Sequence, residues 1–206
     1  MKVLIVVDVQ KDFCPGGALA VREGDAVVPI INALQPKFDL VVATQDWHPA
    51  NHDSFAANHS GKNIGEVIQL GDLPQVLWPV HCVQDTEGAE FVAELDTSRI
   101  AQVFRKGTDS QIDSYSGFFD NGHKRATGLG EYLQEQNATA VYVAGLATDY
   151  CVKFTALDAH QLGFETYLVE DACRGVDLNE GDVRRSIEAM REAGVHIVHS
   201  MDVAPA

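Results

Sequence analysis

Short apolar runs that alternate with longer amphipathic stretches constrain the fold of this chain more than any other feature. The runs are rich in Val, Ile and Leu and mostly lack polar alternation, as strands buried on both faces do. They occupy residues 3–9, 40–44, 100–104, 140–144, 166–169 and 196–199. Strands of this kind favour a parallel sheet.

Amphipathic segments between these runs read as helices. They cover residues 25–34, 126–136, 149–162 and 180–193, and Gly163 and Gly194 are good stop signals for the last two. Strands that alternate with helices predict a three-layer α/β fold with right-handed crossovers. The 206 residues suit one domain, which we expect to span 1–206.

Charge and apolar length exclude several classes of protein. The 30 acidic residues outnumber the 15 basic ones, which argues against nucleic-acid binding. No apolar run approaches the ~20 residues that span a bilayer, and the first run is too short for a signal peptide. We therefore expect a cytoplasmic protein without a membrane partner. Its four cysteines form no C-x-x-C pair, so we expect free thiols.

Ionisable residues follow four of the predicted strands. Asp8 lies near the end of the first strand, Asp46 and His48 follow the second, Lys106 follows the third and Cys151 follows the fourth. Because ligands of open parallel sheets bind beyond the carboxyl ends of the strands, we expect these groups to converge at one edge. Two long segments, 46–84 and 106–124, also start there, and long loops in compact domains are usually functional or disordered.

Cys151 lies where a strand passes through a tight turn into a helix. With Thr148 as the expected N-cap, the thiol falls in the first helical turn, where the helix dipole favours a thiolate and free N–H groups can hold an oxyanion. The alternative is a small buried core residue. Cys82 and Cys173 fit that alternative better, and Cys14 has no assigned role.

Asp8 and Lys106 each have a functional and a structural interpretation. An aspartate embedded in an apolar strand loses hydration, which raises its pKa and suits it to proton transfer; it could equally cap a loop. A lysine at Lys106 would favour neighbouring anions, or it could be a solvated strand-end residue. Strand alternation sends Arg105 and Lys106 to opposite faces, so only one of them can point at the site.

Asp46, His48 and His81 have the residue types of a metal site. The first two, two positions apart, lie on one side of an extended segment, and His81 could close the site from further along. One carboxylate with two or three imidazoles suits zinc, iron(II) or manganese(II). Histidine-rich loops also occur without metal, and the membership of His52 and His59 stays open.

Aromatic residues flank the same predicted edge. Phe13, Trp78 and Tyr115 could stack against a flat heteroaromatic substrate, although plain core packing is the alternative.

Six segments together carry a family resemblance. They are VDVQKDFCPGGAL (7–19), TQDWHPANHDSF (44–55), WPVHCV (78–83), RKG (105–107), YSGF (115–118) and GLATDYCV (145–152). In this order they resemble the nicotinamidases of the isochorismatase-like hydrolase superfamily, from the first strand to the helix after Cys151. The resemblance implies a six-stranded parallel sheet between helix layers.

The resemblance also implies roles for individual residues. It makes Asp8, Lys106 and Cys151 a catalytic triad. It makes Asp46, His48 and His81 the ligands of one divalent metal ion, zinc first and iron or manganese as alternatives, with His52 a fourth ligand in some members.

Further implied roles concern the oxyanion and the substrate. The peptide between Leu146 and Ala147 would be cis, and the N–H groups of Ala147 and Cys151 would hold the oxyanion. Phe13 and Trp78 would sandwich a pyridine ring. We expect the substrate-binding set to be Phe13, Trp78, Leu146 and Tyr115.

The activity that follows from this resemblance is hydrolysis of nicotinamide to nicotinate and ammonia through a Cys151 thioester, in NAD salvage. Related enzymes also hydrolyse pyrazinamide, and we expect the same here. The rivals are an amidohydrolase of carbamoyl or ureido compounds, isochorismate hydrolysis, and a metal-storage or metal-sensing domain. The first two generally lack the metal loop, and the third leaves the triad unexplained. Assembly into a homo-oligomer stays open.

Overall fold

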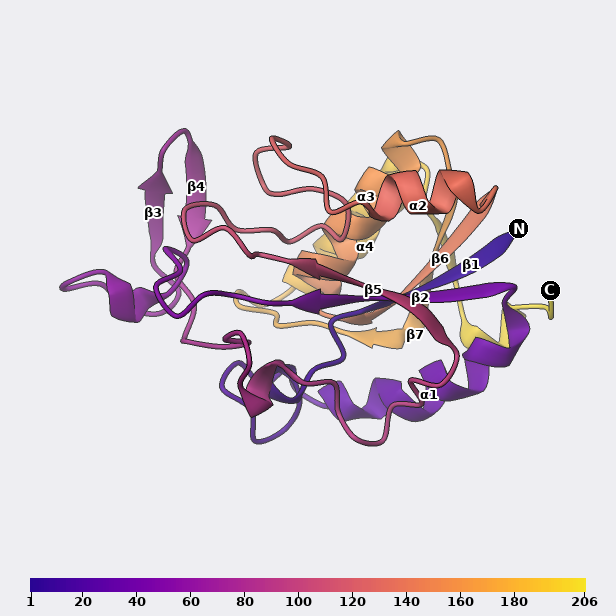
Figure 1. Cartoon of the computed structure of the whole chain (residues 1–206), viewed down its shortest axis with the longest axis horizontal. Helices are drawn as coiled ribbons and strands as arrows, with labels where there is room; N and C mark the ends of the chain where they lie inside the picture. The colour runs from indigo at the N-terminus through magenta and orange to yellow at the C-terminus, as the bar shows by residue number, and fades with distance from the viewer.

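A six-stranded parallel sheet forms the centre of the molecule (Figure 1). The computed structural model describes all residues, 1–206. In the order β5-β2-β1-β6-β7-β8, every neighbouring pair of strands is parallel. The strands are β1 Lys2–Val7, β2 Leu40–Asp46, β5 Ile100–Lys106, β6 Ala140–Leu146, β7 Glu165–Arg174 and β8 His196–Val198. All six predicted strands are therefore confirmed.

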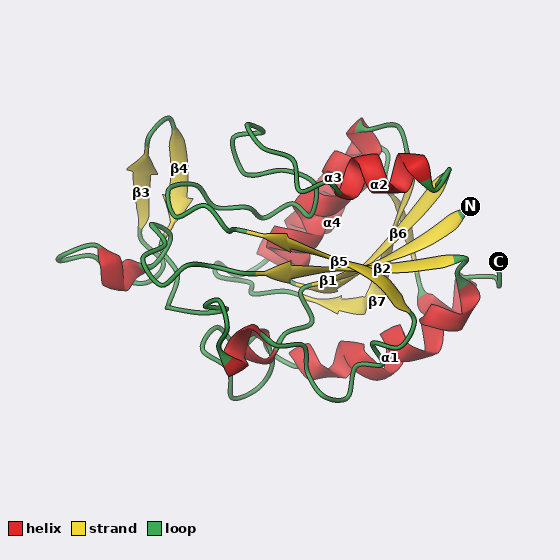
Figure 2. Ribbon diagram, in the orientation of Figure 1, coloured by secondary structure: helices red, strands yellow, loops and turns green.

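Helices cover both faces of the sheet (Figure 2). They are α1 Val27–Leu34, α2 Leu129–Glu135, α3 Lys153–Gln161 and α4 Asp182–Ala193. The side chains of β1 divide between two cores: Leu4 and Val6 pack with α1, while Val3, Ile5 and Val7 pack with α2, α3 and α4. This division produces the three predicted layers.

The ends of two strands differ from the prediction. β1 ends at Val7 instead of residue 9, because Asp8 adopts a left-handed backbone conformation with φ 48° that breaks the extended run. β7 runs from Glu165 to Arg174, five residues beyond its predicted end, with a register irregularity opposite β6 between Val143 and Gly145. Apolar patterning alone locates neither end.

An antiparallel hairpin inside the first long segment was not predicted. It consists of β3 Val67–Leu70 and β4 Leu73–Val76, and it stands apart from the central sheet (Figure 1). Its two-residue turn has Gly71 at φ 56° followed by Asp72, a combination that favours tight hairpins. Exposed and half-buried residues alternate along β3, so its apolar signal is weak.

Short turns of helix complete the structure. Single turns lie at Lys11–Phe13, Gly24–Ala26, Gln35–Lys37, Ala56–Asn58, Glu87–Ala89 and Ser200–Asp202, and a π turn lies at Thr148–Val152. None of the helices has the length and apolar character needed to cross a bilayer.

Candidate active site

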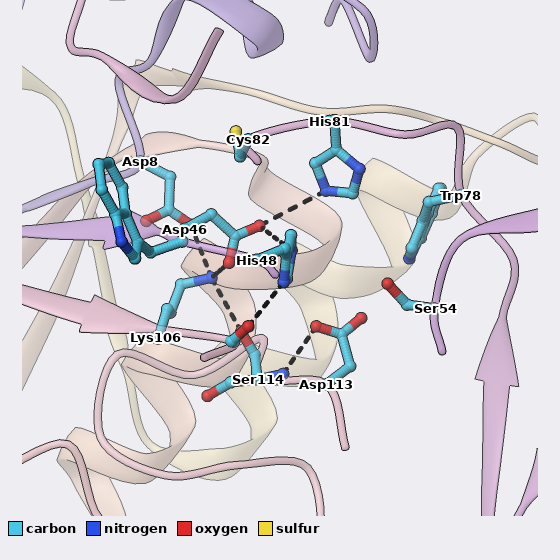
Figure 3. Close-up of polar contacts among 12 residues, drawn as sticks. Asp8, Asp46, His48, Ser54, Trp78, His81, Cys82, Lys106, Asp113 and Ser114 are labelled. Carbon is cyan, nitrogen blue, oxygen red and sulfur yellow. Dashed lines mark hydrogen bonds and ion pairs between the residues drawn. The ribbon is translucent and has the colours of Figure 1, made fainter. Parts of the chain in front are cut away.

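Four adjacent strands bring the predicted ionisable residues to one edge of the sheet, as expected. The carboxyl ends of β5, β2, β1 and β6 are neighbours, and Asp46 pairs in register with Lys106. Asp8 comes directly after β1, and Cys151 follows β6 in the π turn. Figure 3 shows Asp8, Asp46 and Lys106 pointing toward one another.

Lys106 is the centre of this group. Its side chain is 0% exposed, and its Nζ lies 2.8 Å from Asp46 Oδ1, 2.9 Å from Asp8 Oδ2 and 3.3 Å from Cys151 Sγ. Arg105 points the other way, with its guanidinium 3.8 Å from the centroid of the Trp47 ring. Only one of the two residues therefore points at the site, as strand alternation predicted, and it is Lys106, as the resemblance implied.

One carboxylate oxygen of Asp8, Oδ2, has no hydrogen-bond donor in the protein. The three ammonium protons of Lys106 are donated to Asp46 Oδ1, to Ser114 O at 2.9 Å and to Cys151 Sγ. Thr44 Oγ1 donates to Asp8 Oδ1 at 2.7 Å. Asp8 Oδ2 is therefore close to the ammonium but accepts no well-aligned hydrogen bond. A lone pair on this oxygen can receive the thiol proton.

Burial governs the protonation of the triad. It raises the pKa of the Cys151 thiol well above the ordinary value; Lys106 opposes this effect, while Asp8 and Asp46 reinforce it. Burial also raises the pKa of Asp8, again against the effect of Lys106. A neutral resting thiol needs a base, and a carboxyl with a raised pKa is suited to shuttle its proton.

The turn that carries Cys151 differs from the predicted one. Ala147, not Thr148, is the N-cap, and no side chain caps the helix. The carbonyl of Ala147 accepts from the N–H groups of Tyr150 and Val152, both at 3.1 Å, so the first turn is widened into a π turn. The Leu146–Ala147 peptide is cis, as the resemblance implied. The N–H of Ala147 donates to no protein acceptor.

Asp46, His48 and His81 form a buried cluster that fits a metal ion. Their ligand atoms lie within 4.8 Å of one another. His48 Nδ1 donates to Gly107 O at 2.9 Å and His81 Nδ1 donates to Pro79 O at 2.7 Å, since carbonyl oxygens only accept. The Nε2 of each ring therefore faces Asp46 Oδ2, at 3.0 Å for His48 and 3.5 Å for His81. Anchored imidazoles of this kind are typical of metal ligands.

Electrostatics at this cluster favour a positive charge. Burial lowers the pKa of His48, but the Asp46 carboxylate outweighs it and the pKa rises to about 9. The Asp46 carboxylate that stabilises a protonated His48 ring would stabilise a metal cation between the two residues in the same way.

His52 and His59 are not among the grouped ligand atoms of this cluster, although the centroid of the His52 ring lies 4.3 Å from that of His48. His52 instead lies with His48 and Asp113 in a second buried group. Its Nδ1 accepts from the Ser54 N–H at 3.1 Å and lies 2.7 Å from Ser54 Oγ, while its buried Nε2 has no hydrogen-bond partner. His59 Nε2 donates to Asp53 O at 2.7 Å.

A pocket opens between the triad and the Asp46–His48–His81 cluster. Its lining residues are Phe13, Leu19, Asp46, Trp78, His81, Asp113, Tyr115, Ala147, Tyr150, Cys151 and Val176. Phe13, Trp78 and Tyr115 are therefore placed as predicted. Leu146 is not: it is fully buried among core residues, because β6 continues through it and turns its side chain inward.

Several pocket residues were not predicted. Asp113 is a buried carboxylate in the segment after Lys106, and only its position beside Ser114 and Tyr115 could have suggested it. Val176 belongs to the C-terminal part, where its backbone N–H donates to Asp149 at 2.9 Å. That contact joins segments far apart in the sequence and leaves no local pattern.

The other cysteines lie outside the pocket. All four are free thiols, as predicted. Cys82 and Cys173 are core residues. Cys14 lines a different cleft, of about 960 Å³, which includes neither the triad nor the Asp46–His48–His81 cluster.

Comparison with known proteins agrees with this geometry. The family model of the isochorismatase domain matches residues 2–202. The chain belongs to the isochorismatase family. It is 47% identical to the nicotinamidase of Acinetobacter baylyi, over an alignment that covers 97% of this chain and 93% of the relative. It is 48% identical to the nicotinamidase of Escherichia coli over 94% and 92%.

Solved structures of the family show the same fold. An Acinetobacter baumannii nicotinamidase/pyrazinamidase superposes with a TM-score of 0.95 at 49% identity, covering 98% of this chain and 97% of that one. An L. infantum protein in complex with nicotinate has a TM-score of 0.85 at 40% identity, covering 98% and 93%. A Pyrococcus horikoshii pyrazinamidase in complex with zinc has a TM-score of 0.78 at 41% identity, covering 96% and 98%.

Proposed function

We propose that this chain, as one hydrolase domain, is a nicotinamidase that converts nicotinamide to nicotinate and ammonia. The observation that carries the proposal is the buried contact of Lys106 with Asp8 and Cys151, beside an aromatic pocket and an Asp–His–His cluster. Relatives that share almost the whole chain at 47–48% identity are nicotinamidases, which supports the same reaction here. We place the reaction in NAD salvage in the cytoplasm, where buried free thiols stay reduced.

Proton transfer to Asp8 starts the proposed reaction. The free Oδ2 of Asp8 accepts the proton of the Cys151 thiol, and the sulfur attacks the carboxamide carbon. The N–H groups of Ala147 and Cys151 hold the developing oxyanion. Lys106 keeps the carboxylate and the sulfur at their positions and balances their charges.

Collapse of the tetrahedral intermediate releases ammonia, to which Asp8 returns the proton. The acyl group is then a thioester on Cys151. Water attacks the thioester carbon and gives one proton to Asp8. As the C–S bond breaks, Asp8 returns this proton to the sulfur and restores the thiol, and the acid leaves as nicotinate after it loses its proton to solvent.

Asp46, His48 and His81 are the residues that would hold a divalent cation, for which we propose zinc, with iron(II) or manganese(II) as alternatives. Such a cation supplies a Lewis acid beside the pocket. The zinc complex of the P. horikoshii pyrazinamidase supports this choice. We infer that His52, which is not among the grouped ligand atoms of Asp46, His48 and His81, is not a fourth ligand.

An ammonia-release assay tests the proposal. The purified enzyme is offered nicotinamide, pyrazinamide and a set of carbamoyl and ureido compounds, each with and without a chelator. We expect release from nicotinamide and pyrazinamide, and loss of activity after chelation.

The rival functions give different results in the same assay. A preference for carbamoyl or ureido compounds would replace the proposed substrate with another amide. Absence of ammonia from every substrate, in a protein that retains its metal, would favour a storage or sensing role.

A further inference from the structure

The β3–β4 hairpin contacts residues of the pocket wall through one buried side chain. Gln75, on β4, is 3% exposed, although its strand lies in a hairpin that stands apart from the central sheet (Figure 1). Its neighbours Pro74 and Val76 are exposed and half-buried. A buried amide in such a small element needs partners, because an unpaired polar group away from water is costly.

The amide of Gln75 contacts two residues of the pocket wall. Its Nε2 lies 3.1 Å from Asp113 Oδ2 and 3.3 Å from Tyr115 Oη, and it also lies 2.7 Å from Val76 O. A carbonyl and a carboxylate accept only, so the orientation with the NH₂ group toward them is the one that chemistry allows. The NH₂ group has two hydrogens, for which Val76 O and Asp113 Oδ2 are the two nearest acceptors, so Tyr115 Oη at 3.3 Å can only share one of them.

Tyr115 is held from two sides. The indole Nε1 of Trp78, which can only donate, donates to Tyr115 Oη at 3.2 Å. With N–H donors directed at its oxygen, the phenol has its own O–H hydrogen left to donate, and no protein acceptor takes it. Burial raises the pKa of Tyr115 well above its ordinary value, so the phenol keeps this hydrogen.

Asp113 is fixed by the same arrangement. Its Oδ2 accepts from Gln75, and its Oδ1 accepts from the Ser114 N–H at 2.7 Å. Figure 3 shows its carboxylate on the side of the site where Trp78 lies, away from Asp8 and Lys106. Gln75 thus contacts Asp113 and Tyr115, the second of which also contacts Trp78, without lining the pocket itself.

We propose that Gln75 is a positioning residue for substrate binding, which fixes the Asp113 carboxylate and the Tyr115 hydroxyl in the pocket wall opposite the triad. This role rests on the proposed nicotinamidase activity. In this role the hairpin contributes to substrate affinity, and the reaction at Cys151 depends on the triad. Replacement of Gln75 should therefore raise KM and leave kcat nearly unchanged.

Gln75→Met tests this role, because methionine has a similar length and no N–H group. We expect KM for nicotinamide to rise about tenfold, the scale of one lost hydrogen bond to a charged group, with kcat within about twofold. Gln69→Met is the matched control: Gln69 is exposed on β3 of the same hairpin, and its variant should keep the KM of the unmodified enzyme.

A double-mutant cycle with Tyr115→Phe adds a second readout. If Gln75 acts through the hydroxyl, Gln75→Met should raise KM by a smaller factor in the Tyr115→Phe background than in the unmodified enzyme. Should Gln75→Met not fold, Gln75→Glu keeps the size of the side chain and faces Asp113 with a second carboxylate, and the same rise in KM is expected.

Three results would overturn the role of Gln75. They are a KM within about twofold of the unmodified enzyme, a loss confined to kcat, or full additivity with Tyr115→Phe. The unmodified enzyme keeps this test separate from the proposed function: no ammonia from nicotinamide in that sample refutes the function, whereas normal release with an unchanged variant refutes only the role of Gln75.

Discussion

Replacing Lys106 with methionine removes one charge from the most buried ionic group of the molecule. Methionine nearly preserves the volume of the side chain, so the perturbation is electrostatic. The ammonium lies 2.9 Å from Asp8 Oδ2 and 2.8 Å from Asp46 Oδ1, and the lysine side chain is 0% exposed. Without it, two carboxylates face each other with no cation from the protein between them.

The magnitude follows from burial. Removing one partner of a buried ion pair costs about 3–5 kcal/mol, because the remaining charge is uncompensated. Asp8 can limit this loss by taking up a proton, since burial already raises its pKa. We therefore expect the free energy of unfolding to fall by about 3 kcal/mol, and Tm to fall by about 6–12 °C for a chain of this size.

Thermal and urea unfolding, followed by circular dichroism near neutral pH, measures this loss. Both proteins are treated with chelator first, so that metal held by Asp46 does not differ between them. Lys62→Met is the control, because Lys62 forms an exposed i,i+4 pair with Glu66 at 3.2 Å and should contribute less than about 1 kcal/mol. A Lys106→Met protein as stable as this control would refute the assigned electrostatics.

Three further predictions concern catalysis and metal binding. Asp8→Asn should lower kcat by about 100- to 10,000-fold in the ammonia assay, because an amide cannot accept the thiol proton; near-normal turnover would exclude Asp8 as the base. His48→Ala should lose most of its bound metal by elemental analysis, whereas His52→Ala should retain it, since His52 lies outside the cluster; equal losses would contradict this assignment. Gly107→Ala should weaken metal binding about 10- to 100-fold, because its Cβ would lie 2.4 Å from the His48 ring; unchanged affinity would show that the ring can move.

The sequence predicted those parts of the molecule that depend on local patterning and topology. The first five residues of the 3–9 run are buried on both faces, and that environment leaves a continuous apolar pattern. Asp8, Lys106 and Cys151 converge because the carboxyl ends of neighbouring parallel strands share one edge. Both features follow from residue order alone.

The remaining features depend on contacts between distant segments. Gln75 is buried only because Asp113 and Tyr115 lie against its hairpin. Thr148 has a good capping side chain, yet the widened π turn leaves Ala147 as the N-cap. Leu146 is the last residue of β6, and as part of the strand its side chain packs in the core. No hydrophobic periodicity or turn motif in the sequence indicates any of these three features.

Acid quenching during turnover, followed by peptide mapping with mass spectrometry, is the most direct test of Cys151 as the nucleophile. A nucleophilic Cys151 predicts a nicotinoyl adduct on the peptide that contains it, and no ammonia release from Cys151→Ala despite unchanged metal content. An adduct on Cys14, Cys82 or Cys173, or sustained turnover by Cys151→Ala, would contradict it.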